Sequence, residues 1–185
     1  MASDIAWKAL QWPGLEHVIV SDNAAGFRAR GQLVLAEDGI FSVGYELACD
    51  TGWRFSELTI GVTSADTDKN LRLALRADGH RLANDRARPD LDDCVDIDIN
   101  CTPLTNTLPI RRLDWSTASS HDLNVAYVSV PELEVRAVQQ RYTRLEGAGR
   151  EEPAFRYESR SFRADLSVDD SGFVVDYPEL WRRVT

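Results

Sequence analysis

The segment from Asp92 to Arg112, DDCVDIDINCTPLTNTLPIRR, contains the residues whose types and spacing could do chemistry. Asp96 and Asp98 are two residues apart, so both carboxylates share one face of a strand, about 6.6 Å apart at about 3.3 Å per residue. That distance is near the lower limit for the two acids of an inverting glycosidase. Such acids must flank a sugar from opposite sides, however, and neighbours on one strand rarely do. A glycan hydrolase is therefore a minor alternative, and we expect the chain not to be an enzyme.

The strand that carries these acids alternates strictly from Cys94 to Cys101, with Val95, Ile97 and Ile99 on one face. Asp96, Asp98 and Asn100 occupy the other face. The simplest interpretation is a half-buried strand with a solvated acidic face. In the alternative, the polar row faces a cavity or the arginine pair Arg111–Arg112.

A short helix is predicted after Pro103. Asn106 or Thr107 can begin it, and Pro109 is tolerated in its first turn because the amides there have no partner within the helix. Arg111 and Arg112 point to different faces of any helix, so at most one reaches a given anionic group. If one faces inward, Asp96 or Asp98 can pair with it. A structural ion pair is at least as expected as a ligand clamp.

Composition excludes several classes of protein. The 185 residues carry a net charge of −9, which argues against nucleic-acid binding because phosphates require a basic face. Neither an export signal nor an apolar run long enough to span a membrane is evident. Cys49, Cys94 and Cys101 lack metal-ligand spacing and are expected to be reduced, buried thiols of a cytoplasmic protein. We expect no cofactor and no metal.

The elements that must position these residues are short amphipathic strands with period-two alternation. Examples lie within 27–35, 43–49, 53–62, 71–75, 123–127, 134–145, 155–159, 162–168 and 173–177. A change of phase between Phe55 and Leu58 predicts a bulge. Segments 84–93 and 146–153 are predicted to be loops, and 178–184 a final helical turn. About a dozen strands at this spacing predict one all-β domain over 1–185, mainly antiparallel, in a sheet that curls on itself.

Several segments carry a resemblance to a known family: WPGLEHV at 12–18, YELACDTGW at 45–53, TPLTNTLPIRRL at 102–113 and VVDYPELWRR at 174–183. The last two are specific, because ordinary amphipathic strands do not produce them. The chain resembles, over nearly its whole length, the bacterial family named "putative glycolipid-binding", formerly a domain of unknown function. That resemblance implies a long antiparallel sheet wound as a spiral β-roll around one short central helix, similar to the lipoprotein-localisation factors of the bacterial envelope.

The resemblance further implies a central cavity and a homodimer. It favours a non-catalytic protein that binds an amphiphile, a glycolipid or another lipid, in the roll. A structural or scaffolding homodimer without ligand is the alternative, since exposed strand edges can pair across a two-fold axis. Aromatic rings would line the cavity, while polar and charged groups would hold a head group. The candidate ligand-binding residues are Trp53, Asp96, Asp98, Asn106, Arg111, Arg112, Tyr142, Arg144, Tyr157 and Tyr177.

Overall fold

The computed structural model describes residues 2–146 and 152–185, and its strands form one 15-stranded sheet. The strands are β1 (Ala2–Ala9), β2 (Gly14–Asn23), β3 (Gly26–Ala36), β4 (Ile40–Cys49), β5 (Phe55–Thr63), β6 (Asp68–Leu75), β7 (Arg81–Ala83), β8 (Arg86–Ala87), β9 (Asp96–Ile99), β10 (Ser120–Val128), β11 (Val135–Leu145), β12 (Ala154–Ser159), β13 (Phe162–Val168), β14 (Val174–Tyr177) and β15 (Trp181–Arg183). Two 3₁₀ turns, η1 (Pro89–Leu91) and η2 (Leu104–Asn106), and one helix, α1 (Thr107–Arg112), complete the described elements.

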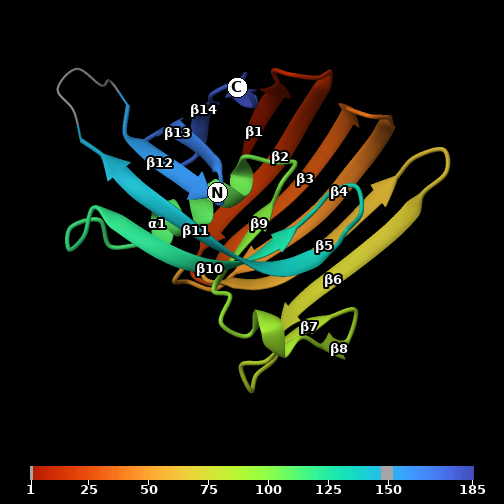
Figure 1. Ribbon diagram of the computed structural model, residues 1–185, viewed down its shortest axis with the longest axis horizontal. Helices are drawn as coiled ribbons and strands as arrows, with labels where there is room; N and C mark the ends of the chain where they lie inside the picture. The colour runs from red at the N-terminus through yellow and green to blue at the C-terminus, as the bar shows by residue number, and fades with distance from the viewer. Residues whose placement is uncertain (1, 147–151) are drawn as a thin grey trace.

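The sheet runs in the order β8-β7-β6-β5-β4-β3-β2-β1-β15-β14-β13-β12-β11-β10-β9 and curls around the helix (Figure 1). Neighbouring strands are antiparallel except for β9 and β10, which are parallel. Strand β1 pairs with both β2 and β15, so the two ends of the chain meet in the middle of the sheet. The segment that leads into edge strand β9 approaches the start of β5, because the Phe55 amide donates a 3.0 Å hydrogen bond to the Val95 carbonyl. The predicted all-β, mainly antiparallel curled sheet is confirmed.

The strands form where period-two alternation lets one face enter the core. In β3, Phe27, Leu33 and Leu35 are buried, whereas Arg28 and Arg30 are exposed. The predicted bulge is confirmed, because the pairing of β4 with β5 shifts register between Ala48 and Cys49. All three cysteines are free and buried, as expected.

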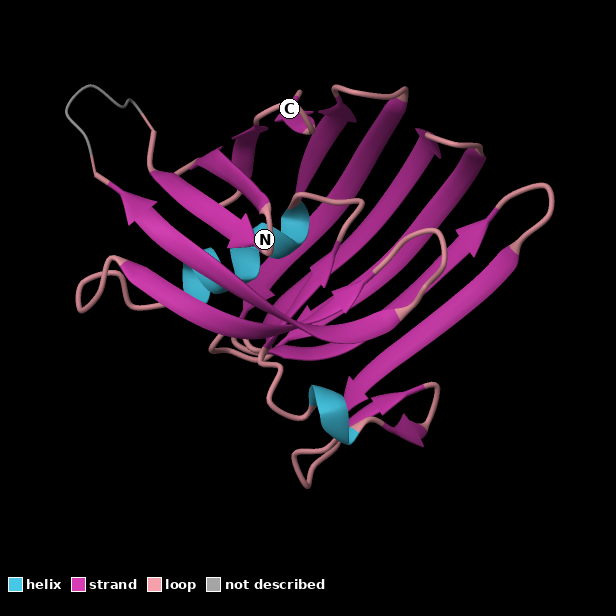
Figure 2. Ribbon diagram, viewed as in Figure 1, coloured by secondary structure: helices cyan, strands magenta, loops and turns pink. Residues whose placement is uncertain are grey.

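The turn η2 and the helix α1 follow each other without a break and together form the central helical segment, residues 104–112. This segment lies inside the curl of the sheet (Figure 2). Leu104, Leu108 and Ile110 are buried and anchor it to the core. Pro109 falls in the first turn of α1, as predicted. Asn106 occupies the N-cap position, but its side chain does not cap the helix.

Three local predictions were wrong. Segment 178–184 contains a strand, β15, rather than a helical turn, because its backbone pairs with both β1 and β14 and buries Trp181. The predicted loop 84–93 contains β8 and η1. In 173–177 the buried residues are Val174 and Tyr177 rather than an alternating set, since a register shift accompanies the pairing of β13 with β14. Most of the loop predicted at 146–153 lies outside the described residues.

Candidate functional site

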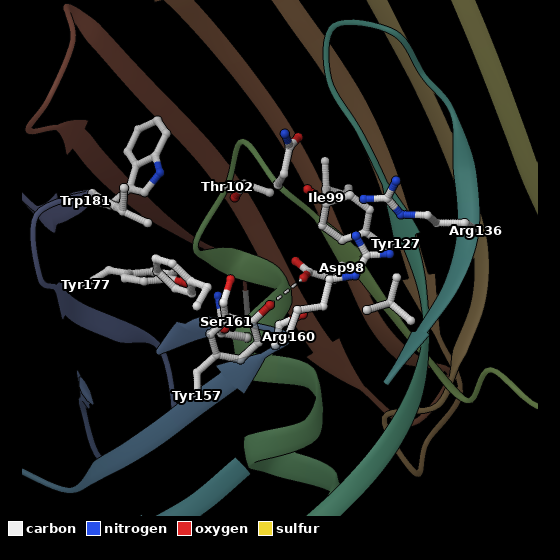
Figure 3. A pocket seen from close by; sticks show the side chains of 16 residues that line it. Asp98, Ile99, Thr102, Tyr127, Arg136, Tyr157, Arg160, Ser161, Tyr177 and Trp181 are labelled. Carbon is white, nitrogen blue, oxygen red and sulfur yellow. Dashed lines mark hydrogen bonds between the residues drawn. The ribbon is translucent and has the colours of Figure 1, made fainter. Parts of the chain in front are cut away.

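A cavity of about 310 Å³ lies on the concave side of the sheet, beside the central helical segment (Figure 3). Its walls come from β9, η2, β10, β11, the β12–β13 hairpin and the strands β14 and β15. Four of the predicted site residues line it: Asp98, Asn106, Tyr157 and Tyr177. These residues are distant in sequence, and the curl of the sheet brings them together.

Asp98 provides a partly buried acceptor in the cavity wall. Its carboxylate accepts hydrogen bonds from Gln140 Nε2 at 2.6 Å, from the Tyr157 hydroxyl at 3.1 Å and from Thr105 Oγ1 at 3.2 Å. Burial raises the pKa of Asp98, and these three hydrogen bonds partly counter that rise. Asp98 forms no ion pair with any of the described residues, so these three donors hold its carboxyl in place.

Aromatic rings form a second part of the wall. The ring of Tyr157 lies 6.0 Å from Phe162 and 6.4 Å from Tyr177, measured between centroids. Trp181 also lines the cavity, near Tyr177 (Figure 3). Burial raises the pKa of both Tyr157 and Tyr177, so their hydroxyls stay protonated. The cavity therefore combines flat apolar faces with hydroxyl groups that can donate or accept.

Two arginines that the sequence analysis missed, Arg136 and Arg160, line the exposed side of the cavity. Arg136 lies over the ring of Tyr127, 4.9 Å from its centroid. A signal for Arg136 was present, because it shares a strand face with Val138, which is buried in the cavity wall. Arg160 sits in the β12–β13 turn at φ 54, where alternation gives no signal.

Asp96 and Arg112 form an ion pair between β9 and α1. The carboxylate accepts hydrogen bonds from Arg112 Nε at 3.1 Å and Nη2 at 2.5 Å. The Asp96 side chain is 1% exposed and that of Arg112 is 16% exposed. The predicted solvated acidic face is therefore wrong, because the helical segment covers that face of β9. Of the two arginines, Arg112 faces inward.

Trp53 and Arg111 lie in a separate cavity of about 140 Å³. The guanidinium of Arg111 is 4.9 Å from the Trp53 ring centroid, and Trp53 stacks on Phe27 at 4.4 Å. Trp53 has φ 63, an uncommon value for a bulky residue, so packing holds it in this position. The structure does not bring these two residues to the 310 Å³ cavity.

The remaining candidates play different structural parts. Tyr142 is buried, and its hydroxyl donates a 2.8 Å hydrogen bond to Asn106 Oδ1, which positions that residue at the cavity. Arg144 is exposed and lines none of the described cavities. Of the ten predicted residues, four therefore line the 310 Å³ cavity. The other six support its wall or lie elsewhere in the structure.

The described residues contain no group of histidine, cysteine and acidic side chains that could hold a metal ion. Within residues 2–146 and 152–185, no helix has the length and apolar character needed to cross a membrane.

Comparison with known proteins places these features in a family. Among solved structures, a DUF1089 family protein from Pseudomonas aeruginosa is 32% identical, with a TM-score of 0.78 over 91% of this chain and 92% of that chain. A β-barrel-like protein of unknown function (DUF1849) from Brucella abortus is 8% identical, with a TM-score of 0.55 over 98% of this chain and 93% of that chain, and supports the fold alone. No curated protein matches. A family model described as "Putative glycolipid-binding" matches residues 4–183, and the chain belongs to that family.

Proposed function

We propose that this chain is a non-catalytic binding protein that holds the polar head group of an amphiphile, a glycolipid or another lipid, in the 310 Å³ cavity. The observation that carries this proposal is the composition of the wall. Asp98, Asn106 and the hydroxyl of Tyr157 offer hydrogen bonds beside the flat rings of Tyr177 and Trp181. Aromatic faces with a few fixed polar groups suit a ligand that has both apolar and hydroxylated surfaces.

The cavity volume favours a head group over a whole lipid. Ligand cavities commonly span about 300–1,000 Å³, so this one is at the lower end of the range. Phe162 lines it and is 43% exposed, which provides an apolar contact at the rim. Acyl chains would leave the cavity past this rim.

The non-catalytic part of the proposal is supported by the environments of the two acids considered for hydrolysis. Asp96 is held by Arg112 and does not line the cavity, whereas Asp98 does. The pair therefore does not flank a common space, as hydrolysis of a glycosidic bond requires. The expected homodimer and the cytoplasmic location stay predictions.

A ligand search combined with a cavity-filling variant tests the proposal. The purified protein is analysed by native mass spectrometry, and bound material is extracted into organic solvent and identified. Ser159→Trp places an indole in the cavity, and Glu158→Trp is the matched control because successive residues of β12 point to opposite faces. We expect an amphiphile to accompany the native protein and Glu158→Trp but not Ser159→Trp. An empty native protein that stays empty after incubation with total bacterial lipid would contradict the proposal.

A further inference from the structure

Two arginines, Arg136 and Arg160, line the 310 Å³ cavity. Elsewhere, Arg88, Arg141 and Arg156 each form a close ion pair with an aspartate. Within the described residues, no ion pair involves Arg136 or Arg160, although the chain carries a net charge of −9. A shortage of acids therefore does not explain why these two guanidinium groups are unpaired.

Both guanidinium groups act on the same part of the cavity, around Tyr127. Arg136 lies over its ring at 4.9 Å. Burial and, next, the negative charge of Asp98 raise the pKa of the Tyr127 hydroxyl, while the positive charges of Arg136 and Arg160 oppose that rise. Figure 3 shows Tyr127 and Arg136 on the opposite side of the cavity from Tyr177 and Trp181. Two like charges that line one cavity repel each other, and an anion bound in that cavity would relieve the repulsion.

We infer that the cavity takes an acidic sugar head group, with its phosphate, sulfonate or carboxylate held by Arg136 and Arg160 and its hydroxyls by Asp98 and Asn106. Guanidinium groups bind such anions through paired hydrogen bonds, which fixes orientation as well as charge. Asp98 is an acceptor and cannot bind the anionic group, so it favours a ligand that also carries hydroxyl groups. This inference rests on the proposed function and names the class of head group.

The test compares lipids that differ in charge and in sugar. Phosphatidylcholine vesicles carry glucosyl diacylglycerol, sulfoquinovosyl diacylglycerol or phosphatidylserine, and binding is measured by co-sedimentation. We expect the acidic sugar lipid to bind about tenfold more tightly than the neutral one, since two exposed charge contacts together contribute that factor. Arg136→Gln/Arg160→Gln should abolish the preference. Arg28→Gln/Arg163→Gln, which removes the same charge away from this cavity, should retain it.

Several outcomes separate the possible failures. Equal binding of the two sugar lipids, or a preference that survives in Arg136→Gln/Arg160→Gln, overturns the inference and leaves the proposed function standing. Equal binding of phosphatidylserine and the acidic sugar lipid also overturns it, because charge alone would then suffice. If the protein binds glucose 6-phosphate but none of the sugar lipids, the inference of an acidic sugar stands, whereas the lipid part of the proposed function is overturned. If Ser159→Trp binds every lipid as the native protein does, the proposed function fails as well.

Discussion

At the scale of single residues, the interior of the roll is notable for carboxyl groups held in three different ways. The Asp96 carboxylate is paired with an arginine, whereas the Asp98 carboxylate accepts hydrogen bonds from one amide and two hydroxyl groups. Glu16 is fully buried, and within residues 2–146 and 152–185 its carboxylate accepts hydrogen bonds from two hydroxyl groups, the Tyr45 hydroxyl at 2.7 Å and Thr102 Oγ1 at 2.8 Å. Because Gly31 has no Cβ, which would lie 2.2 Å from the Tyr45 ring, that ring can cross β3 and reach Glu16. Without a positive partner, Glu16 favours its neutral form.

Glu16 should make the protein less stable as pH rises. Burial raises its pKa from 4.5 to about 8. The folded state therefore binds the proton more tightly than the unfolded state, so this stabilisation is complete below pH 4.5 and is lost as pH rises through about 8. Glu16→Gln should remove this dependence, because an amide resembles the protonated acid. In urea denaturation, we expect its stability relative to the native protein to rise by about 4 kcal/mol from about pH 5 to about pH 9.

His80 is the main complication in that measurement. Its hydrogen bond with Asp92 raises its pKa, so His80 also contributes stability that falls as pH rises. The difference between Glu16→Gln and the native protein isolates the contribution of Glu16, since both retain His80. A difference that stays constant with pH would show that Glu16 is already ionised in the folded state.

At the scale of elements, the ion pair between Asp96 and Arg112 joins α1 to β9, and the adjacent Arg111 provides a matched comparison. Arg112→Met leaves a buried carboxylate without its partner, which should lower the free energy of unfolding by about 3 kcal/mol. The Arg111 side chain is 37% exposed and lies 3.8 Å from Asp22, so Arg111→Met should lower it by less than about 1 kcal/mol. Denaturation of both variants in parallel measures the difference, and equal losses would contradict the assignment of Arg112 as the inward arginine.

The elements themselves were largely predictable because their physical signals are local. Alternation identified β3 and β4, and a change in its phase identified the bulge next to β5. The errors occurred where tertiary contacts override local signals. Segment 178–184 is too short for a periodic pattern, and β15 is a strand because β1 and β14 flank it. The acidic row of β9 reads as a solvent-facing pattern, and only the packed helical segment makes it internal.

At the scale of the whole molecule, the cavity could be only partly predicted. Asp98, Asn106, Tyr157 and Tyr177 were named from the sequence because their types suit a sugar or lipid head group. Alternation does not determine which strands meet across a curled sheet, so Trp53 and Arg111 were grouped with them although they lie at another cavity. The spiral arrangement came from the resemblance to the family rather than from period or spacing.

The junction between β1 and β15 decides whether the two halves of the sheet unfold together. Trp181 is 2% exposed, lies in β15 between β1 and β14, and lines the cavity. Trp181→Ala should lower the free energy of unfolding by about 3–5 kcal/mol. Val184→Ala, at a side chain 50% exposed beside the same strand, should change it by less than about 0.5 kcal/mol. Hydrogen exchange should show amides of β2 to β5 and of β10 to β12 losing protection together. If only the amides of β10 to β12 lose protection, the two halves unfold independently and the pairing of β15 with β1 does not couple them.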